Sequence, residues 1–341
     1  PSPARGRGAG GEGRDKKLVI EYEPDSDLRD TEQVPLLEEG GIEAFIRREV
    51  LPDMKAMADA VHAEGGKISF QITHGGSFVT MCKVKGRTMS SMSGFNPAGS
   101  MAGNFFQRAM NEEDMDRVAN EFASAAKLCR EAGFDAVEIH MGHGYMLNQF
   151  ISPLSNKRTD QYGGNAENRA RFPAMVLKRV KEAVGKDLAV LAKINVADGV
   201  RSGATVDDAI VTGKVLQAAG ADMLVLSGGR NIESTWFIFG SNLNVEEMER
   251  VLHDRWFLRT MMKLSQRFAP KVEFKEMYFL DYSRKIRAAL DARKRPDSRP
   301  RRRRHTLHAR VPGAQPWALP TSTRAAEEGG ELRNRDRKSV V

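Results

Sequence analysis

The stretch IHMGHGYMLNQF (139–150) holds three side chains that can donate or transfer protons. His140 and His143 are three residues apart, and Tyr145 follows two residues later. Imidazoles in such a group can be structural, or they can bind a metal ion. Alternatively, two imidazole N–H groups can hold one carbonyl oxygen while the phenol supplies a proton. The last arrangement suits reduction of an electron-poor C=C bond.

The metal interpretation has the least support of the three. A His-x-x-His pair supplies two ligands, and this stretch adds no acidic or thiol residue as a third. We therefore predict no metal site. The structural and the hydrogen-bonding interpretations of the two histidines both stay open at this point.

A unit that recurs along the chain predicts the elements that position these residues. Each copy is an amphipathic stretch that ends at Gly and is followed by a short apolar run, as in 58–72, 128–140, 180–194 and 215–228. Gly just past a helix takes the left-handed conformation that ends it, and the apolar runs have the length of buried strands. Alternation of helices and buried strands indicates a parallel sheet with helices outside it.

Polar residues lie near the C-terminal ends of the four predicted strands. They are Gln71 on strand 67–73, His140 on strand 135–140, Lys193 and Asn195 on strand 190–195, and Ser227 and Gly228 on and after strand 222–227. A (β/α)8 barrel assembles its site from this end of its strands. A doubly wound sheet binds ligands at the same edge, but the sequence has no GxGxxG loop after an early predicted strand and no GxxxxGK[ST] loop. We therefore predict an α/β fold of the (β/α)8 barrel type.

Two helices can be delimited from the sequence. Asn111 is a good N-cap, Asp114 adds acid to the first turn, and an apolar face with spacings of three and four follows. A second regular face predicts a helix over 274–291. Between strand 135–140 and a helix beginning near Asn168 lies a loop of about 27 residues, a length that is uncommon unless the loop is functional.

Composition argues against several classes of protein. No apolar run among the 341 residues reaches the ~18 needed to cross a bilayer, so we expect no membrane association. The two cysteines, Cys82 and Cys129, are too few for a disulfide framework or a four-thiolate cluster, and we expect ordinary thiols. The net charge of +8 comes from one tract, because residues 293–310 carry nine Lys or Arg and one Asp, which leaves 44 basic and 44 acidic residues elsewhere. The body of the chain therefore carries no general electrostatic footprint for nucleic acid.

Residues 139–169, IHMGHGYMLNQFISPLSNKRTDQYGGNAENR, resemble the Old Yellow Enzyme family of flavin oxidoreductases, including the barrel domain of 2,4-dienoyl-CoA reductases. The shared pattern is H-x-x-H-G-Y, then N-Q-F-x-S-P, then N-x-R-x-D-x-Y-G-G-x-x-x-N-R, and a looser resemblance extends from about residue 40 to about residue 292. The resemblance implies an FMN-binding (β/α)8 barrel. It also implies that NADH or NADPH passes hydride to FMN, and that flavin N5 passes it to an activated alkene such as an enone or a dienoyl group.

The same resemblance assigns roles to individual residues. His140 and His143 match the pair that binds the substrate carbonyl, and Tyr145 matches the proton donor to the α-carbon. Gln71 matches a strand-end Gln that contacts the flavin ring. Lys193 stands where many members place an Arg beside the flavin N1/O2 edge, where a cation favours the anionic reduced flavin. The alternative for Lys193 is a salt-bridged lysine inside the barrel.

Other residues in or near the match have simpler interpretations. Arg158, Asp160 and Tyr162 are expected to fix the loop through an ion pair and packing. Three aromatic residues after the last predicted strand could cover a substrate, although such clusters are more often core packing: Trp236, Phe237 and Phe239.

The two ends of the chain depart from the family pattern. Barrel strands one, seven and eight are not recognisable; KLVIEYE (17–23) is at most a remnant of an early strand, and helix 274–291 is followed by an Arg-, Pro- and Gly-rich tail. The glycine-rich loops that hold the FMN phosphate after strands seven and eight are missing from the pattern. We therefore expect a disordered segment over 1–15, a partial barrel over 16–292 and a disordered tail over 293–341.

Two hypotheses follow from these observations. The first is an FMN-dependent oxidoreductase that takes hydride from NADH or NADPH and reduces a small-molecule alkene or enone. The second is a non-catalytic truncated barrel that does not retain FMN, with a basic tail that makes at most non-specific contacts with nucleic acid. The abrupt change of composition near residue 292 favours a reading-frame shift or a retained non-coding segment. We expect a cytoplasmic protein, with an organellar transit peptide at the N-terminal end as the alternative, and the sequence leaves the oligomeric state open.

Overall fold

The computed structural model describes residues 41–79, 83–241, 256, 260, 264 and 271–291. The chain divides into two compact units, Pro1–Val50 and Leu51–Val341. In the first unit the described residues form helix α1 (Gly41–Phe45), which continues as the π-helix η2 (Ile46–Val50). The expected disordered ends, 1–15 and 293–341, and the possible strand 17–23 lie outside the described residues.

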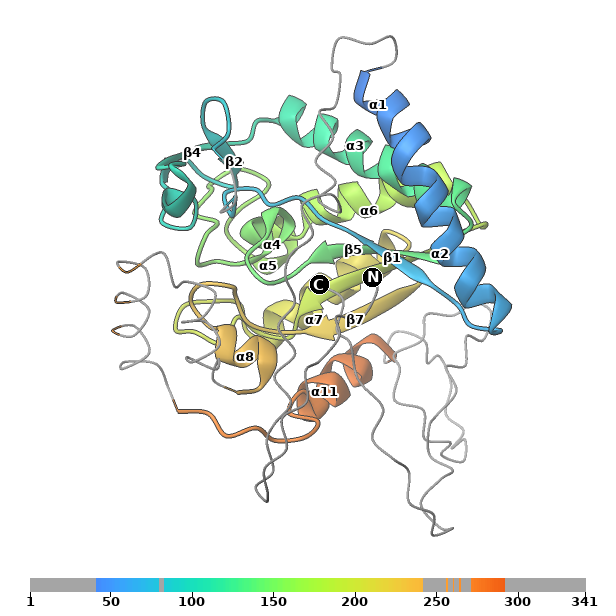
Figure 1. Ribbon diagram of the computed structural model, residues 1–341. Helices are drawn as coiled ribbons and strands as arrows, with labels where there is room; N and C mark the ends of the chain where they lie inside the picture. Colours follow the sequence, from blue (N-terminus) through green and yellow to red (C-terminus); the bar gives the residue numbers. More distant parts are fainter. Residues whose placement is uncertain are drawn as a thin grey trace, which may run out of the picture. The chain divides into compact units, whose positions relative to one another are not determined.

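A four-stranded parallel sheet is the main sheet of the second unit (Figure 1). Its strands lie in the order β1 (Ser69–Ile72), β5 (Ala136–Met141), β6 (Ala189–Asn195) and β7 (Met223–Ser227). This arrangement confirms the parallel sheet predicted from the four helix–strand units. The register places Gln71 opposite Glu138, His140 opposite Lys193, and Asn195 opposite Ser227. The polar residues near the strand ends are therefore neighbours across the sheet.

Long helices accompany the sheet: α2 (Leu51–Ala63), α3 (Glu112–Glu131), α6 (Arg171–Val184), α7 (Val206–Ala218) and α11 (Leu280–Asp291). α3 packs against α6, α6 against α7, and α7 against α11, so the helices follow one another in a layer (Figure 1). The predicted start of α3 is confirmed, because Asn111 and Asp114 bond each other's backbone N–H in a capping box.

The two faces of the sheet differ because side chains alternate along each strand. On β5, Val137, Ile139 and Met141 are fully buried and belong to the hydrophobic core that includes the apolar residues of α3 and α6. Glu138 and His140 lie on the opposite face, which we call the inner face. The helix layer therefore buries one face, and the predicted site residues of the strands lie on the other.

The prediction of a helix over 274–291 is wrong at its beginning, because α11 starts at Leu280. Met277 has a φ of 56°, a left-handed conformation that a regular α-helix does not contain. The residues before Leu280 form a turn instead. The apolar face is otherwise as predicted, with Ile286 and Leu290 buried against the core.

The long segment after β5 was predicted to be a loop. The structure shows that it contains the short helices α4 (Met146–Ile151) and α5 (Ala166–Arg169). The next long helix, α6, begins at Arg171 rather than near Asn168, because Asn165 caps the separate helix α5. Further short elements escape sequence prediction because they carry no periodic signal. They are a small sheet in the order β2 (Thr88–Ser90), β4 (Phe106–Ala109) and β3 (Gly94–Phe95), the 3-10 helix η3 (Ser100–Ala102) and helix α8 (Thr235–Phe239). Within the described ranges, no helix has both the length and the apolar character needed to cross a membrane.

Candidate active site

A tight turn after β5 places His143 at the C-terminal edge of the sheet. His143 has a φ of 59°, and Gly144 after it has a φ of 86°. A left-handed conformation is uncommon for a residue with a side chain and persists where surrounding contacts impose it. The His143 N–H donates to Asn195 Oδ1 (3.1 Å), and its carbonyl accepts from the Asn231 N–H (3.0 Å). A Cβ at Gly142 would lie 2.7 Å from Asn195 Oδ1, so this close approach requires glycine.

The structure brings His140, His143 and Tyr145 together. The His140 ring lies edge-to-face with the His143 ring, and the two centroids are 4.8 Å apart. The Tyr145 ring is also 4.8 Å from the His140 ring, and its other neighbour is Phe78 at 5.5 Å. The three groups that the sequence analysis selected thus form one cluster at the end of β5.

Hydrogen bonds at the two imidazoles define their available N–H groups. The Gly142 N–H donates to His140 Nδ1 (3.2 Å), so the proton of the neutral His140 ring lies on Nε2. His143 Nε2 lies 2.7 Å from the hydroxyl oxygen of Ser227, at the end of β7. A serine hydroxyl can accept a proton from Nε2 or donate one to it. Ser227 is therefore the neighbour that influences the tautomer of His143.

Burial keeps both imidazoles neutral at neutral pH. Burial, then the neighbouring His143 and then Lys193, lower the pKa of His140 to about 3. Burial and then Lys193 lower the pKa of His143 to about 4. The pair therefore offers N–H dipoles rather than positive charge. Such dipoles, fixed before a ligand arrives, stabilise negative charge that develops on a carbonyl oxygen.

Packing and backbone hydrogen bonds position the Tyr145 phenol. Tyr145 is the N-cap of α4; its N–H donates to the Gly142 carbonyl (3.2 Å), and its carbonyl accepts from the Gln149 N–H (2.8 Å). Among the described residues, the Tyr145 hydroxyl has no hydrogen-bond partner. The hydroxyl is thus held near the two imidazoles and stays available to a ligand.

The two predicted flavin contacts, Gln71 and Lys193, meet at a third residue that the sequence analysis did not select. The Gln71 side-chain N–H donates to Glu138 Oε1, and Lys193 Nζ lies 3.4 Å from the same oxygen. The three residues come from the adjacent strands β1, β5 and β6 and share the inner face. Lys193 therefore forms a salt bridge, as the alternative prediction for this residue stated. Glu138 could have been found from its position two residues before His140, on the same face of the strand.

The inner face suits the ring of a flavin. Gln71 is exposed and keeps its carbonyl oxygen, and Lys193 keeps N–H donors beyond the contact with Glu138. The pyrimidine edge of a flavin carries carbonyl and ring-nitrogen acceptors together with one N–H donor, so the two residues complement it. The loops expected to be missing are those after the seventh and eighth strands of the family barrel, which would hold the FMN phosphate. The part of the chain where they would follow lies outside the described residues.

A buried polar network holds Asn195 and, through it, the turn at His143. The Asn195 side-chain N–H donates to Asp198 Oδ1 (3.0 Å) and to the Gly229 carbonyl (2.8 Å). Asp198 is fully buried and also accepts from the Ser152 hydroxyl (2.5 Å). The sequence marked Asn195 as a strand-end residue, but no local pattern pointed to Asp198, whose partners are Asn195, three residues away, and the distant Ser152.

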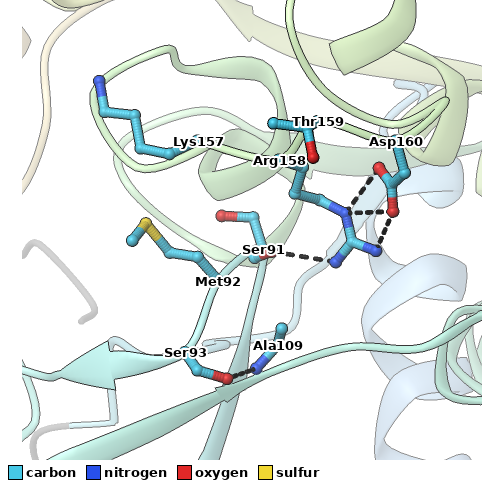
Figure 2. A pocket seen from close by; sticks show the side chains of 8 residues that line it. All are labelled: Ser91, Met92, Ser93, Ala109, Lys157, Arg158, Thr159 and Asp160. Carbon is cyan, nitrogen blue, oxygen red and sulfur yellow. Dashed lines mark hydrogen bonds and ion pairs between the residues drawn. The ribbon is translucent and has the colours of Figure 1, made fainter.

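A pocket of about 300 Å³ lies at the loop that carries Arg158 (Figure 2). It is lined by Ser91, Met92, Ser93, Ala109, Lys157, Arg158, Thr159 and Asp160. The Arg158 guanidinium pairs with Asp160 (2.5 Å) and donates to the carbonyls of Ser91 (3.0 Å) and Met110 (2.9 Å). Tyr162 packs beside it and against the core. The predicted ion pair and packing are confirmed, and the histidine–tyrosine cluster does not line this pocket.

Phe237 on α8 packs against its neighbour Trp236 and against the segment around α11. The Phe237 ring lies 5.3 Å from the Phe279 ring and 5.9 Å from the Tyr282 ring, and Trp236 is its neighbour at 5.5 Å. Phe239 is 54% exposed. Core packing is therefore confirmed for Phe237, and a substrate cover by Trp236 or Phe239 stays a prediction.

The expectations for thiols and metals can be compared with part of the chain. Burial raises the pKa of the Cys129 thiol to about 11, as expected for an ordinary thiol, and Cys82 lies outside the described residues. Where the structure describes the chain, no three His, Cys, Asp or Glu side chains are grouped so that they could hold a metal ion.

Comparison with known proteins connects this site to a family. Residues 42–236 match the family model described as NADH:flavin oxidoreductase / NADH oxidase. The chain belongs to this family. Membership in the NADH:flavin oxidoreductase family confirms the predicted (β/α)8 barrel class, of which the described residues supply four parallel strands. It also confirms the predicted enzyme class, a flavin-dependent NAD(P)H oxidoreductase, and the family implies FMN as the cofactor.

This chain spans less than two thirds of the length of the relatives described next. A 4,4'-dithiodibutanoate disulfide reductase from Rhodococcus erythropolis is 32% identical over 249 residues, which cover 70% of this chain and 59% of the relative. An NADH oxidase from Thermoanaerobacter brockii is 35% identical over 173 residues, which cover 51% and 26%. A solved complex of 2-naphthoyl-CoA reductase with 2-naphthoyl-CoA shares the fold, with a TM-score of 0.53 and 24% identity over 71% of this chain and 33% of that chain.

Proposed function

We propose that the chain is an FMN-dependent oxidoreductase that reduces an activated C=C bond, of enone or dienoyl type, with hydride from NADH or NADPH. One observation carries the proposal. Two neutral imidazoles and an available phenol are in ring contact at the C-terminal edge of a parallel sheet. This set can bind a carbonyl oxygen and supply a proton without a metal ligand set.

His140 and His143 would bind the substrate carbonyl oxygen through their N–H groups. The two hydrogen bonds draw electron density from the conjugated double bond and make its β-carbon electrophilic. FMN, when bound and reduced by NADH or NADPH, supplies the hydride that the β-carbon accepts. Tyr145 would then give its hydroxyl proton to the α-carbon, so that one hydride and one proton saturate the bond. Gln71 and Lys193 would hold the flavin ring.

A second candidate substrate is a disulfide, because the Rhodococcus relative is named as a disulfide reductase. Reduction of a disulfide also consumes one hydride and one proton, and it releases two thiols. A disulfide bond has no carbonyl oxygen at the reacting centre. Replacing His140 by Ala should therefore impair enone reduction strongly and disulfide reduction much less, which separates the two candidates.

The test begins with flavin binding and continues with the two half-reactions. The purified chain should be yellow, or should become so with FMN, with absorbance near ~450 nm that is characteristic of the flavin cofactor. In rapid mixing, Tyr145→Phe should slow reoxidation of the reduced flavin by an enone by about 10²-fold or more, while reduction by NAD(P)H is nearly unchanged.

Tyr282→Phe on α11 is the matched control, since Tyr282 packs against Phe237 and lies outside the proposed site. It should leave both half-reactions unchanged. A chain that takes up no FMN would support the non-catalytic alternative. Equal slowing of both half-reactions by Tyr145→Phe would remove Tyr145 as the proton donor.

A further inference from the structure

Glu138 links the two groups that are expected to meet the flavin ring, Gln71 and Lys193. Its Oε1 accepts from the Gln71 side-chain N–H and lies 3.4 Å from Lys193 Nζ. The contacts bridge three adjacent strands, because Gln71 on β1 is opposite Glu138 on β5, and Lys193 on β6 lies two residues beyond the residue opposite Glu138. One carboxylate oxygen thus organises the inner face from β1 to β6.

The carboxylate determines which atoms Gln71 and Lys193 present. An ionised carboxylate only accepts hydrogen bonds, so the Gln71 amide must turn its nitrogen towards Glu138. The Gln71 carbonyl oxygen is then the atom left for a ligand, where it would accept from a ring N–H. Lys193 keeps its remaining N–H donors for ring acceptors. Removal of Glu138 would leave the Gln71 amide free to present either end.

Lys193 depends on such a partner more than an arginine would. An ammonium is a point charge on a flexible four-carbon stem, whereas a guanidinium is a rigid planar fork. The Lys193 side chain is 25% exposed and that of Glu138 is 13% exposed, so the pair is only partly screened by water. The cation is also close enough to the imidazoles to lower the pKa of both His140 and His143.

We propose that Glu138 is a positioning residue, which orients the Gln71 amide and holds the Lys193 ammonium on the inner face for contact with the flavin ring. The inference rests on the proposed function, in which a flavin ring covers this face. In this proposal Glu138 contacts neither the substrate nor the flavin. It acts through Gln71 and Lys193.

The first test needs no flavin. The full chain is acetylated with limiting acetic anhydride, and the extent at each lysine is read by peptide mass spectrometry. In Glu138→Gln, which keeps the shape and an acceptor oxygen but loses the charge, Lys193 should be acetylated several-fold faster than in the unmodified sequence. Glu138→Asp, which keeps the charge and withdraws it by one methylene, should raise the rate as well.

A second ion pair on α6 provides the matched control. Glu182 lies 3.9 Å from Lys178, and both side chains are exposed. Glu182→Gln should leave Lys193 acetylation unchanged, and Glu138→Gln should leave Lys178 acetylation unchanged. An unchanged rate at Lys193 in both Glu138 variants, with folding verified by circular dichroism, overturns the proposal whether or not the chain binds flavin.

The second test measures FMN affinity in a double-mutant cycle, by quenching of flavin fluorescence. Glu138→Gln should weaken FMN binding about ten-fold in the unmodified sequence and less than about two-fold in a Lys193→Met background, since residues that act through one another are non-additive. Equal weakening in both backgrounds overturns the proposal. If the unmodified chain binds no FMN, the proposed function fails, and the acetylation rates still decide the role of Glu138.

Discussion

Replacing Gly142 by Ala should disturb the turn that carries His143. The added Cβ would lie 2.7 Å from Asn195 Oδ1, well inside contact distance. Asn195 can move away only by giving up its hydrogen bonds to the His143 N–H, Asp198 and the Gly229 carbonyl. Each bond contributes about 1 kcal/mol net, so a complete escape costs about 3 kcal/mol. Partial adjustment with strain costs about 1–3 kcal/mol. We expect Gly142→Ala to lower the free energy of unfolding by about 2–3 kcal/mol.

Asn195→Ala isolates the cause. It removes the same three hydrogen bonds, at a cost of about 3 kcal/mol, and it also removes the oxygen that the new methyl group meets. The double variant Gly142→Ala/Asn195→Ala should therefore be little less stable than Asn195→Ala alone. The two single costs would then exceed the cost of the double variant by about 2 kcal/mol, which is the coupling expected for residues in contact.

Unfolding in urea, followed by circular dichroism and by intrinsic fluorescence, gives the four free energies. The two probes have to report the same transition for each variant, so that the free energies can be compared. Additive costs would refute the clash with Asn195 as the cause. A Gly142→Ala variant as stable as the unmodified chain would refute the close approach itself.

Two further predictions follow from the pKa values. Because the folded pKa values of His140 (about 3) and His143 (about 4) lie below the ordinary 6.5, the unfolded chain binds more protons below pH 6.5. The free energy of unfolding should therefore fall as the pH decreases from about 6.5 to about 4, and His143→Asn should make this fall shallower. Urea titrations at several pH values measure both slopes, and the same slope for the variant and the unmodified chain would contradict the lowered pKa of His143. The Cys129 thiol, with a pKa of about 11, should resist iodoacetamide at pH 8 in the folded chain and react in urea, as read from its own peptide by mass spectrometry. Fast alkylation without urea would show that this thiol is accessible and ionised.

The sequence predicts those parts of the fold that depend on local patterns. The start of α3 could be predicted because Asn111 and Asp114 are three residues apart and bond each other's backbone. The strands of the main sheet could be predicted because each follows a helix that ends near Gly. Helix α4 could not be predicted, since all six of its residues are buried and the segment shows no amphipathic period. The start of α11 was misplaced because the left-handed turn at Met277 has no signal in that residue type.

The candidate site divides in the same way. His140, His143 and Tyr145 lie within six residues, so their spacing alone brings them together, and the structure places their rings in contact. The strand face of Glu138 can be predicted from His140, but the contacts of Glu138 and of Asp198 cannot, because they involve residues from other strands and loops. Gln71 reaches Glu138 across 67 residues of sequence, and Ser152 reaches Asp198 across 46. The first contact follows from the register of β1 and β5, and the second joins two segments outside the strands. A single sequence specifies neither.

The neutral state of the two imidazoles has a consequence for how molecules reach the site. Glu138 and Lys193 carry opposite charges and are paired, and His140 and His143 are uncharged at neutral pH. These four groups together form a dipolar surface without net charge, so they exert little long-range attraction on an approaching ion. Under the proposed function, arrival of a neutral unsaturated carbonyl compound at this cluster would be governed by diffusion and shape, and it would be nearly independent of ionic strength. In the proposed function, discrimination would begin only at contact, where the carbonyl oxygen would meet the N–H groups.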